Sequence, residues 1–154
     1  MKNFVILICF LFSLSIEAQT ENKSDCTKVY LIRHAEKDRT DKTNSNPHLN
    51  SLGTKRSLKW KDFFKNINFD IIYSTNYHRT LETIKPFSEN GTKLIIYNPS
   101  KIDYNEFVSN NKGKTILVVG HSNTIPTFTN RISNKNLYND IEDNNNSNLY
   151  VVNI

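Results

Sequence analysis

The sequence predicts a three-layer α/β/α sandwich with a mostly parallel central sheet. Three observations lead to this fold class: short apolar runs, helix-like stretches that separate them, and a length of 154 residues, which suits one domain. Strands that are apolar along their whole length are typical of parallel sheets with helices on both faces. In such sheets ligands bind beyond the carboxyl ends of the strands.

Five runs have the composition of strands, because they are rich in β-branched and aromatic residues. They cover residues 28–32, 70–74, 93–97, 115–119 and 149–153. Asn98-Pro99 is expected to end the third strand, and Gly113 lies in the turn that leads into the fourth.

Four helices are predicted between these strands, over residues 51–66, 77–88, 101–110 and 123–132. Asn50 is a suitable cap for the first, and Asn90-Gly91 a suitable stop for the second. The apolar positions of the first helical stretch are Leu52, Leu58, Trp60, Phe63, Phe64 and Ile67. The asparagine-rich run at 143–148 is interpreted as a solvated loop without chemistry.

The first 18 residues have the order of a secretory signal. Lys2 precedes an apolar run at 4–14, and the segment then turns polar and ends in Ala18. The run is short for a membrane-spanning helix. We therefore expect a signal peptide at 1–18, a single catalytic domain at 19–154, export to the periplasm or the cell exterior, and no stable membrane span after cleavage. An uncleaved anchor and a buried N-terminal helix are the alternatives.

The formal net charge of +5 favours anionic ligands in general. The sequence has no dense Lys/Arg run and no nucleic-acid reader motif, so a nucleic-acid partner is not expected. Removal of the signal would leave Cys26 as the single cysteine, which cannot form an internal disulfide. No pair of His or Cys residues shows zinc-ligand spacing on a predicted element, so neither a metal nor another cofactor is expected.

Polar clusters follow three of the predicted strands directly. Arg33-His34 follows the first, residues 74–79 follow the second, and His121-Ser122 follows the fourth. Because the carboxyl ends of parallel strands meet at one edge of a sheet, these residues are expected to converge in one crevice.

The three clusters resemble, in order, the motifs of the histidine phosphatase superfamily, also called phosphoglycerate-mutase-like. The segment 31–37 is similar to its opening Arg-His-Gly element, with Ala35 in the glycine position. Residues 74–80, followed by Glu82-Thr83, are similar to the second element, and residues 119–122 to the third. Residues 49–53 fit the lead into the family's first helix.

The resemblance implies a role for each matched residue. His34 would be the nucleophile, Arg33 and Arg79 would bind phosphate, and His121, with Ser122 beside it, would also contact the phosphate. These residue types suit the chemistry, because a guanidinium group offers a planar fork of donors to phosphate oxygens and a neutral imidazole can attack phosphorus. The other ring nitrogen of His34 should then donate to a backbone carbonyl. The alternative for Arg79 is a salt bridge on the face of its helix. His48 and His78 are not expected to have a specific function.

An alkoxide leaving group needs a general acid, and family members supply a Glu or Asp from beyond the third strand. Asp103 and Glu106 are the candidates here, although both also suit a helix surface. The resemblance implies an exported phosphohydrolase that acts through a phosphohistidine on a phosphorylated small molecule or phosphoprotein. A catalytically impaired phosphate-binding module and a phosphoglycerate-mutase-type phosphotransferase are the alternatives, and activity-independent binding to a host or envelope through the basic surface is a third.

Overall fold

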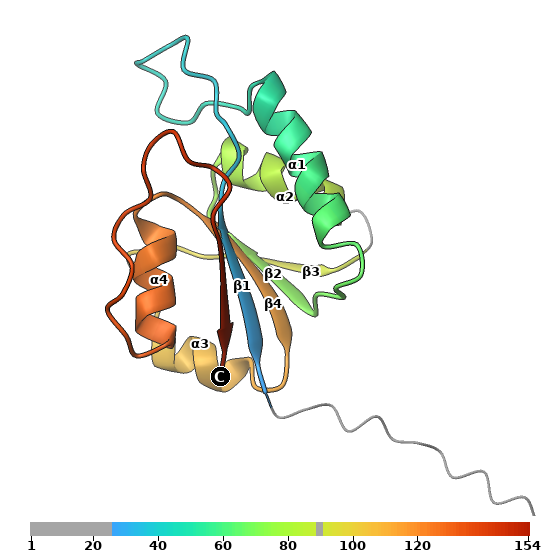
Figure 1. Cartoon of the computed structure of the whole chain (residues 1–154), viewed down its shortest axis with the longest axis vertical. Coiled ribbons are helices and arrows are strands. Elements are labelled where there is room, and N and C mark those ends of the chain that lie inside the picture. The colour runs from blue at the N-terminus through green and yellow to red at the C-terminus, as the bar shows by residue number, and fades with distance from the viewer. Residues whose placement is uncertain (1–25, 89–90) are drawn as a thin grey trace, which may run out of the picture.

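The computed structural model describes residues 26–88 and 91–154, and the predicted signal segment lies outside these ranges. Figure 1 shows a twisted sheet between two pairs of helices. The elements follow the predicted order: β1 (Lys28–Arg33), α1 (Ser51–Phe63), β2 (Ile71–Ser74), α2 (His78–Ser88), β3 (Lys93–Ile96), α3 (Tyr104–Asn110), β4 (Thr115–Gly120), α4 (Thr124–Ile132) and β5 (Leu149–Asn153). Within the described ranges, no helix combines the length and the apolar character needed to cross a membrane.

The sheet is mostly parallel, as predicted. Its strand order is β3-β2-β4-β1-β5. The first four strands in this order run parallel to one another, and β5 pairs antiparallel with β1 at the edge. The strands β1 and β4 pair side by side in the interior of the sheet, in a register that places Arg33 opposite Gly120. The polar segments that follow β1 and β4 therefore begin next to each other.

Two apolar clusters hold the helices to the two faces of the sheet. Residues alternate between the faces, so that Leu31 and Val118 contact the cluster of α3 and α4, whereas Ile32 and Leu117 contact that of α1 and α2. Phe107 and Phe128 fill the first cluster, and Trp60 and Phe64 fill the second. The three-layer α/β/α prediction is confirmed.

The buried face of α1 differs from the one that its leucines suggest. Leu52 and Leu58 are each 55% exposed and Phe63 is 60% exposed, whereas Gly53 and Ser57 are buried beside Trp60. A Cβ atom at Gly53 would lie 2.1 Å from the Glu36 carbonyl oxygen, so only glycine permits this close approach. The Ser57 hydroxyl donates to backbone carbonyls of α2 at 2.9 and 3.2 Å. Backbone contact and hydrogen bonding therefore determine the face of this helix.

The helix ends differ from the predicted ones by up to three residues. The Asn50 side chain accepts a hydrogen bond from Gly53 N, which confirms the predicted cap of α1. Helix α3 begins at Tyr104 and not at residue 101, because the Asp103 side chain accepts hydrogen bonds from Asn105 N and Glu106 N.

Candidate active site

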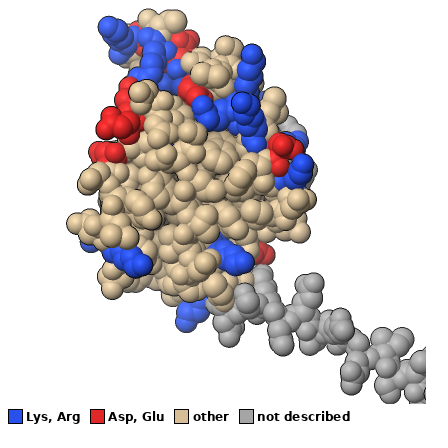
Figure 2. Space-filling view, in the orientation of Figure 1, with Lys and Arg blue, Asp and Glu red and all other residues tan. Residues whose placement is uncertain are grey.

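A cavity of about 840 Å³ opens at the carboxyl ends of the parallel strands. Segments that follow β1, β2 and β4 contribute its walls, together with the segment after β3 and the loop before β5. The lining includes every residue predicted to contact phosphate: Arg33, His34, Arg79, His121 and Ser122. Figure 2 shows Lys and Arg side chains gathered at this end of the molecule, over the loop after β1 and over α1.

His34 lies at the end of β1, where its backbone N–H donates to the Gly120 carbonyl at 2.9 Å. Its side chain is buried, and Nδ1 lies 2.7 Å from the Ala35 carbonyl oxygen. Because a carbonyl can only accept, Nδ1 carries the proton and Nε2 keeps a free lone pair. The pKa of His34 is lowered to about 3, mainly by burial; the hydrogen bond to Ala35 opposes this shift, and the nearby His121, Arg79 and Arg33 add to it. The ring is therefore neutral at physiological pH.

The His121 ring lies beside that of His34, with centroids 5.4 Å apart. Its Nε2 lies 2.9 Å from Thr75 Oγ1, which lies 3.1 Å from Thr80 Oγ1. The Thr80 hydroxyl lies within 2.9 Å of two backbone carbonyls, to which it must donate. Thr75 therefore donates to Thr80 and accepts from His121 Nε2–H, which fixes the tautomer of His121. Burial lowers the pKa of His121 to about 4, with Arg79 as the next cause.

The two arginines differ in how firmly the protein holds them. Arg33 is buried, and its Nη1 donates to the backbone carbonyls of Glu142 and Asn145 at 2.8 and 2.9 Å. Arg79 lies over the Tyr77 ring, with Cζ 4.3 Å from the ring centroid. In the described part of the chain, the buried Nε atoms of Arg33 and Arg79 have no hydrogen-bond partner. Both guanidinium groups line the cavity and place positive charge on its wall.

The asparagine-rich loop before β5 is largely exposed, as predicted, but two of its residues also contact this site. Asn146 is buried and its Nδ2 donates to the His34 carbonyl at 2.9 Å. Asp143 lines the cavity and bridges Arg33 and Arg39, at 3.1 and 2.8 Å. The local sequence carries no apolar period here, and these contacts join residues more than 100 positions apart. Only the density of side-chain amides, which can satisfy backbone groups, hinted at such a role.

Ala35, in the glycine position of the opening motif, fits its surroundings. Its side chain is fully buried and its N–H donates to Thr83 Oγ1 at 2.9 Å. Among the described residues, Asn134 is the one non-glycine residue with a positive φ, so the backbone at Ala35 does not require glycine.

Neither predicted acid candidate lines the cavity. Asp103 caps α3, and Glu106 accepts a hydrogen bond from Asn110 Nδ2 at 3.3 Å on the same helix. Among the described residues that line the cavity, Asp143 is the single carboxylate. Hydrogen bonds from Arg39 and then Arg33 lower its pKa, so it is an anion and a poor proton donor. Glu36 is engaged by Arg56 through contacts of 2.6 to 2.9 Å, whereas Lys37 lines the cavity.

Comparisons with known proteins agree with this geometry. The family model of the histidine phosphatase superfamily (branch 1) matches residues 29–99, which include His34 and Arg79. The chain is similar to the histidine phosphatase superfamily over this segment, which is a little under half of its length. The first two predicted motifs lie within the matched segment, and a search of curated proteins finds no match.

Several solved structures share the superfamily fold. SixA from Agrobacterium tumefaciens is 19% identical with a TM-score of 0.56, and the match covers 68% of this chain and 75% of that one. A protein histidine phosphatase SixA complexed with tungstate is 13% identical, with a TM-score of 0.56 and coverage of 67% and 74%. A phosphoserine phosphatase mutant from Entamoeba histolytica, in complex with phosphoserine, is 21% identical, with a TM-score of 0.53 and coverage of 71% and 81%. At these identities the likeness concerns the fold.

Proposed function

We propose that this histidine phosphatase homologue is an exported phosphohydrolase that forms a phosphohistidine on His34. The observation that carries the proposal is the state of the His34 ring. Its Nδ1–H is held by the Ala35 carbonyl at 2.7 Å, and burial keeps the ring neutral, so Nε2 presents a lone pair to the cavity. Arg33 and Arg79 line the same cavity, where their guanidinium groups place positive charge beside a bound phosphate.

The reaction proceeds in two displacements. His34 Nε2 attacks phosphorus, the Nε2–P bond forms and the bond from phosphorus to the leaving group breaks. Water then attacks phosphorus, the Nε2–P bond breaks, and inorganic phosphate leaves. Arg33 and Arg79 balance the charge on the phosphoryl oxygens throughout. The approach of a dianion favours protonation of the otherwise neutral His121, which then donates to a phosphoryl oxygen.

The lining of the cavity favours substrates whose leaving group needs little protonation. Asp143, the single carboxylate among the described lining residues, is held as an anion by two arginines. An alkoxide is a poor leaving group without a general acid. We therefore infer a preference for phosphoramidates such as phosphohistidine, or for acyl phosphates, over alkyl phosphates. Among the similar solved structures are a protein histidine phosphatase with tungstate and a phosphoserine phosphatase with phosphoserine, and these represent the two substrate classes to compare.

The test is a series of phosphorylated substrates graded by the pKa of the leaving group. We expect kcat/KM to rise with leaving-group acidity, and we expect His34→Ala to lose turnover while its circular dichroism spectrum is unchanged. Asp103→Asn and Glu106→Gln serve as matched controls, because both carboxylates lie outside the cavity. A dependence on leaving-group pKa that steepens in either control would restore that carboxylate as the general acid.

Trapping with radiolabelled substrate separates the proposal from its rivals. We expect an acid-labile phosphoenzyme in the wild type and none in His34→Ala. A protein that binds vanadate but releases no phosphate from any substrate is a phosphate-binding module. Transfer of the label to a second hydroxyl of the substrate, in preference to water, would identify a phosphotransferase of the mutase type.

Export is the second part of the proposal and is tested separately. It is supported by the order of charged, apolar and small residues at 1–18. Expression of the full chain followed by cell fractionation and N-terminal sequencing should give a mature protein that begins at Gln19, outside the cytoplasm. A cytoplasmic protein that retains Met1 would contradict export and leave the enzymatic proposal untouched.

A further inference from the structure

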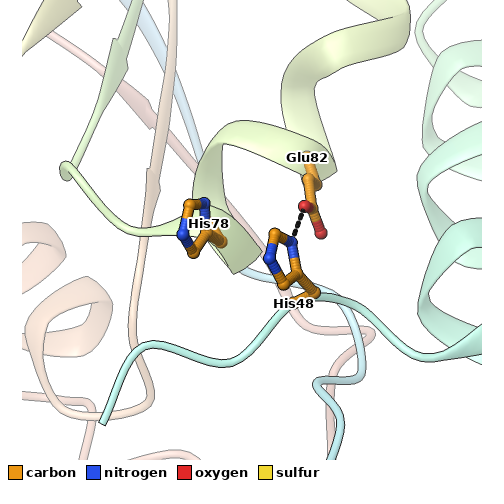
Figure 3. Close-up of side chains that lie close together, drawn as sticks. All are labelled: His48, His78 and Glu82. Atoms are coloured by element: carbon orange, nitrogen blue, oxygen red, sulfur yellow. Dashed lines mark hydrogen bonds and ion pairs between the residues drawn. The ribbon is translucent and has the colours of Figure 1, made fainter. Parts of the chain in front are cut away.

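We propose that His48, His78 and Glu82 form a Zn²⁺ site on the surface of the protein, outside the catalytic cavity. Each of these residues offers one ligand atom, and the three atoms lie within 4.8 Å of one another. Figure 3 shows the three side chains close together, with His78 and Glu82 on α2 and His48 on the loop between β1 and α1. None of the three residues lines the cavity that holds His34.

The backbone places the ligands before an ion binds. His78 and Glu82 lie four residues apart on α2 and therefore share one face of that helix. The His48 ring stacks on the His78 ring with centroids 4.1 Å apart and an angle of 17° between the planes. Because an imidazole ligates in the plane of its ring, the exposed His78 ring must turn out of this stack when an ion binds. His48 Nδ1 also hydrogen-bonds to Glu82 Oε1. A metal ion would take the place of the proton in that hydrogen bond, because both partners ligate in their deprotonated forms.

Two further hydrogen bonds support the cluster from outside. Glu82 Oε2 accepts from Leu49 N at 2.8 Å, which orients the carboxylate and leaves Oε1 for the ion. The Asn46 side chain accepts from His78 N at 2.9 Å, which ties the loop of His48 to the start of α2. Supporting bonds of this kind orient metal ligands in known sites and raise their affinity.

The donor set selects the metal. Two imidazoles and one carboxylate suit Zn²⁺, which binds three protein ligands with a water molecule in the fourth position. Ca²⁺ and Mg²⁺ prefer all-oxygen sites and are not expected here. The His48 side chain is 63% exposed, so an ion can reach the cluster from solvent.

The location of the cluster links it to the catalytic cavity. Arg79 follows His78 on α2, and its Nη1 lies 3.4 Å from the Ser45 carbonyl of the loop that carries His48. An ion that joins this loop to α2 would hold the wall of the cavity from outside. A search for paired His and Cys residues in the sequence misses this site, because one ligand is a carboxylate and His48 is 30 positions from His78.

The experiment measures Zn²⁺ binding to the full chain, without an added histidine tag, by competition with a chromophoric chelator. We expect one equivalent in the wild type and an affinity at least about tenfold weaker in His48→Ala, His78→Ala and Glu82→Gln. Co²⁺ substituted for Zn²⁺ should give a visible absorption spectrum that the same three variants lose.

His34→Ala and His121→Ala are the matched histidine controls, because they remove imidazoles from the cavity and leave the surface cluster intact. We expect both to bind Zn²⁺ as the wild type does. The proposal would be overturned if the wild type bound no Zn²⁺ or if all three cluster variants bound it as tightly as the wild type. Loss of binding in His34→Ala or His121→Ala would also overturn it. His78 is exposed and its side chain is not part of the core, so His78→Ala decides the matter if another variant fails to fold.

Discussion

The substitution His34→Gln should flatten the acid dependence of stability. His34 titrates near its ordinary pKa of 6.5 in the unfolded chain, and burial lowers its pKa to about 3 in the folded protein. Below pH 6.5 the unfolded state therefore binds a proton that the folded state does not, and the free energy of unfolding falls as the pH falls. Each pH unit within this window costs about 1.4 kcal/mol for one such group.

Between pH 7 and about pH 5 the contribution of His34 amounts to about 2 kcal/mol. Urea unfolding at the two pH values measures it. The free energy of unfolding of the wild type should drop by about 2 kcal/mol more than that of His34→Gln, because all other titrating groups are common to the two proteins. The comparison does not depend on how the substitution changes stability at pH 7. Parallel pH profiles for the two proteins would refute the inference that burial keeps the His34 ring neutral.

Three further predictions concern the cavity and the fold. Thr75→Val removes the hydroxyl that accepts from His121 Nε2–H, so turnover of an aryl phosphate should fall about tenfold, the rate equivalent of one hydrogen bond. Asp143→Asn removes the anion that pairs with Arg33, so the Kd for vanadate, measured by titration, should fall a few-fold, because the carboxylate is exposed and its charge is partly screened by solvent. Gly53→Ala places a methyl group against the Glu36 carbonyl, so chemical denaturation should show a loss of at least about 1–3 kcal/mol, whereas Leu58→Ala on the exposed face should stay within about 0.5 kcal/mol of the wild type.

The layers of the fold were predictable because they depend on local composition. The apolar runs around Leu31 and Val118 alternate between two covered faces, and their length and β-branched content are enough to identify strands. The orientation of α1 was not predictable in the same way. Its leucines point to solvent because the approach of Gly53 to the Glu36 backbone and the bonds of Ser57 to α2 fix the opposite face. Such contacts depend on residues elsewhere in the chain, and the spacing of apolar residues along the helix gives no information about them.

The convergence of the candidate site residues was predictable for a related reason. His34, Arg79 and His121 each follow a parallel strand, and the carboxyl ends of parallel strands meet at one edge of the sheet. Asp143 and Asn146 follow no parallel strand, so no rule of topology places them. The place of Asp143 in the cavity lining and of Asn146 against the His34 carbonyl depends on the path of a long loop, and the sequence holds no periodic signal for that path.

The loop before β5 therefore does more than close the sheet. Its backbone carbonyls accept from Arg33, and Asn146 donates to the carbonyl of His34 itself. These bonds fix the Arg33 guanidinium group and the proposed nucleophile His34 relative to each other, although strand geometry would point these two neighbours to opposite faces. Catalysis by a site with few moving groups depends on such preorganisation, because donors already in place need not reorganise as charge develops. In this protein the asparagine-rich loop holds His34 in place through the hydrogen bond from Asn146.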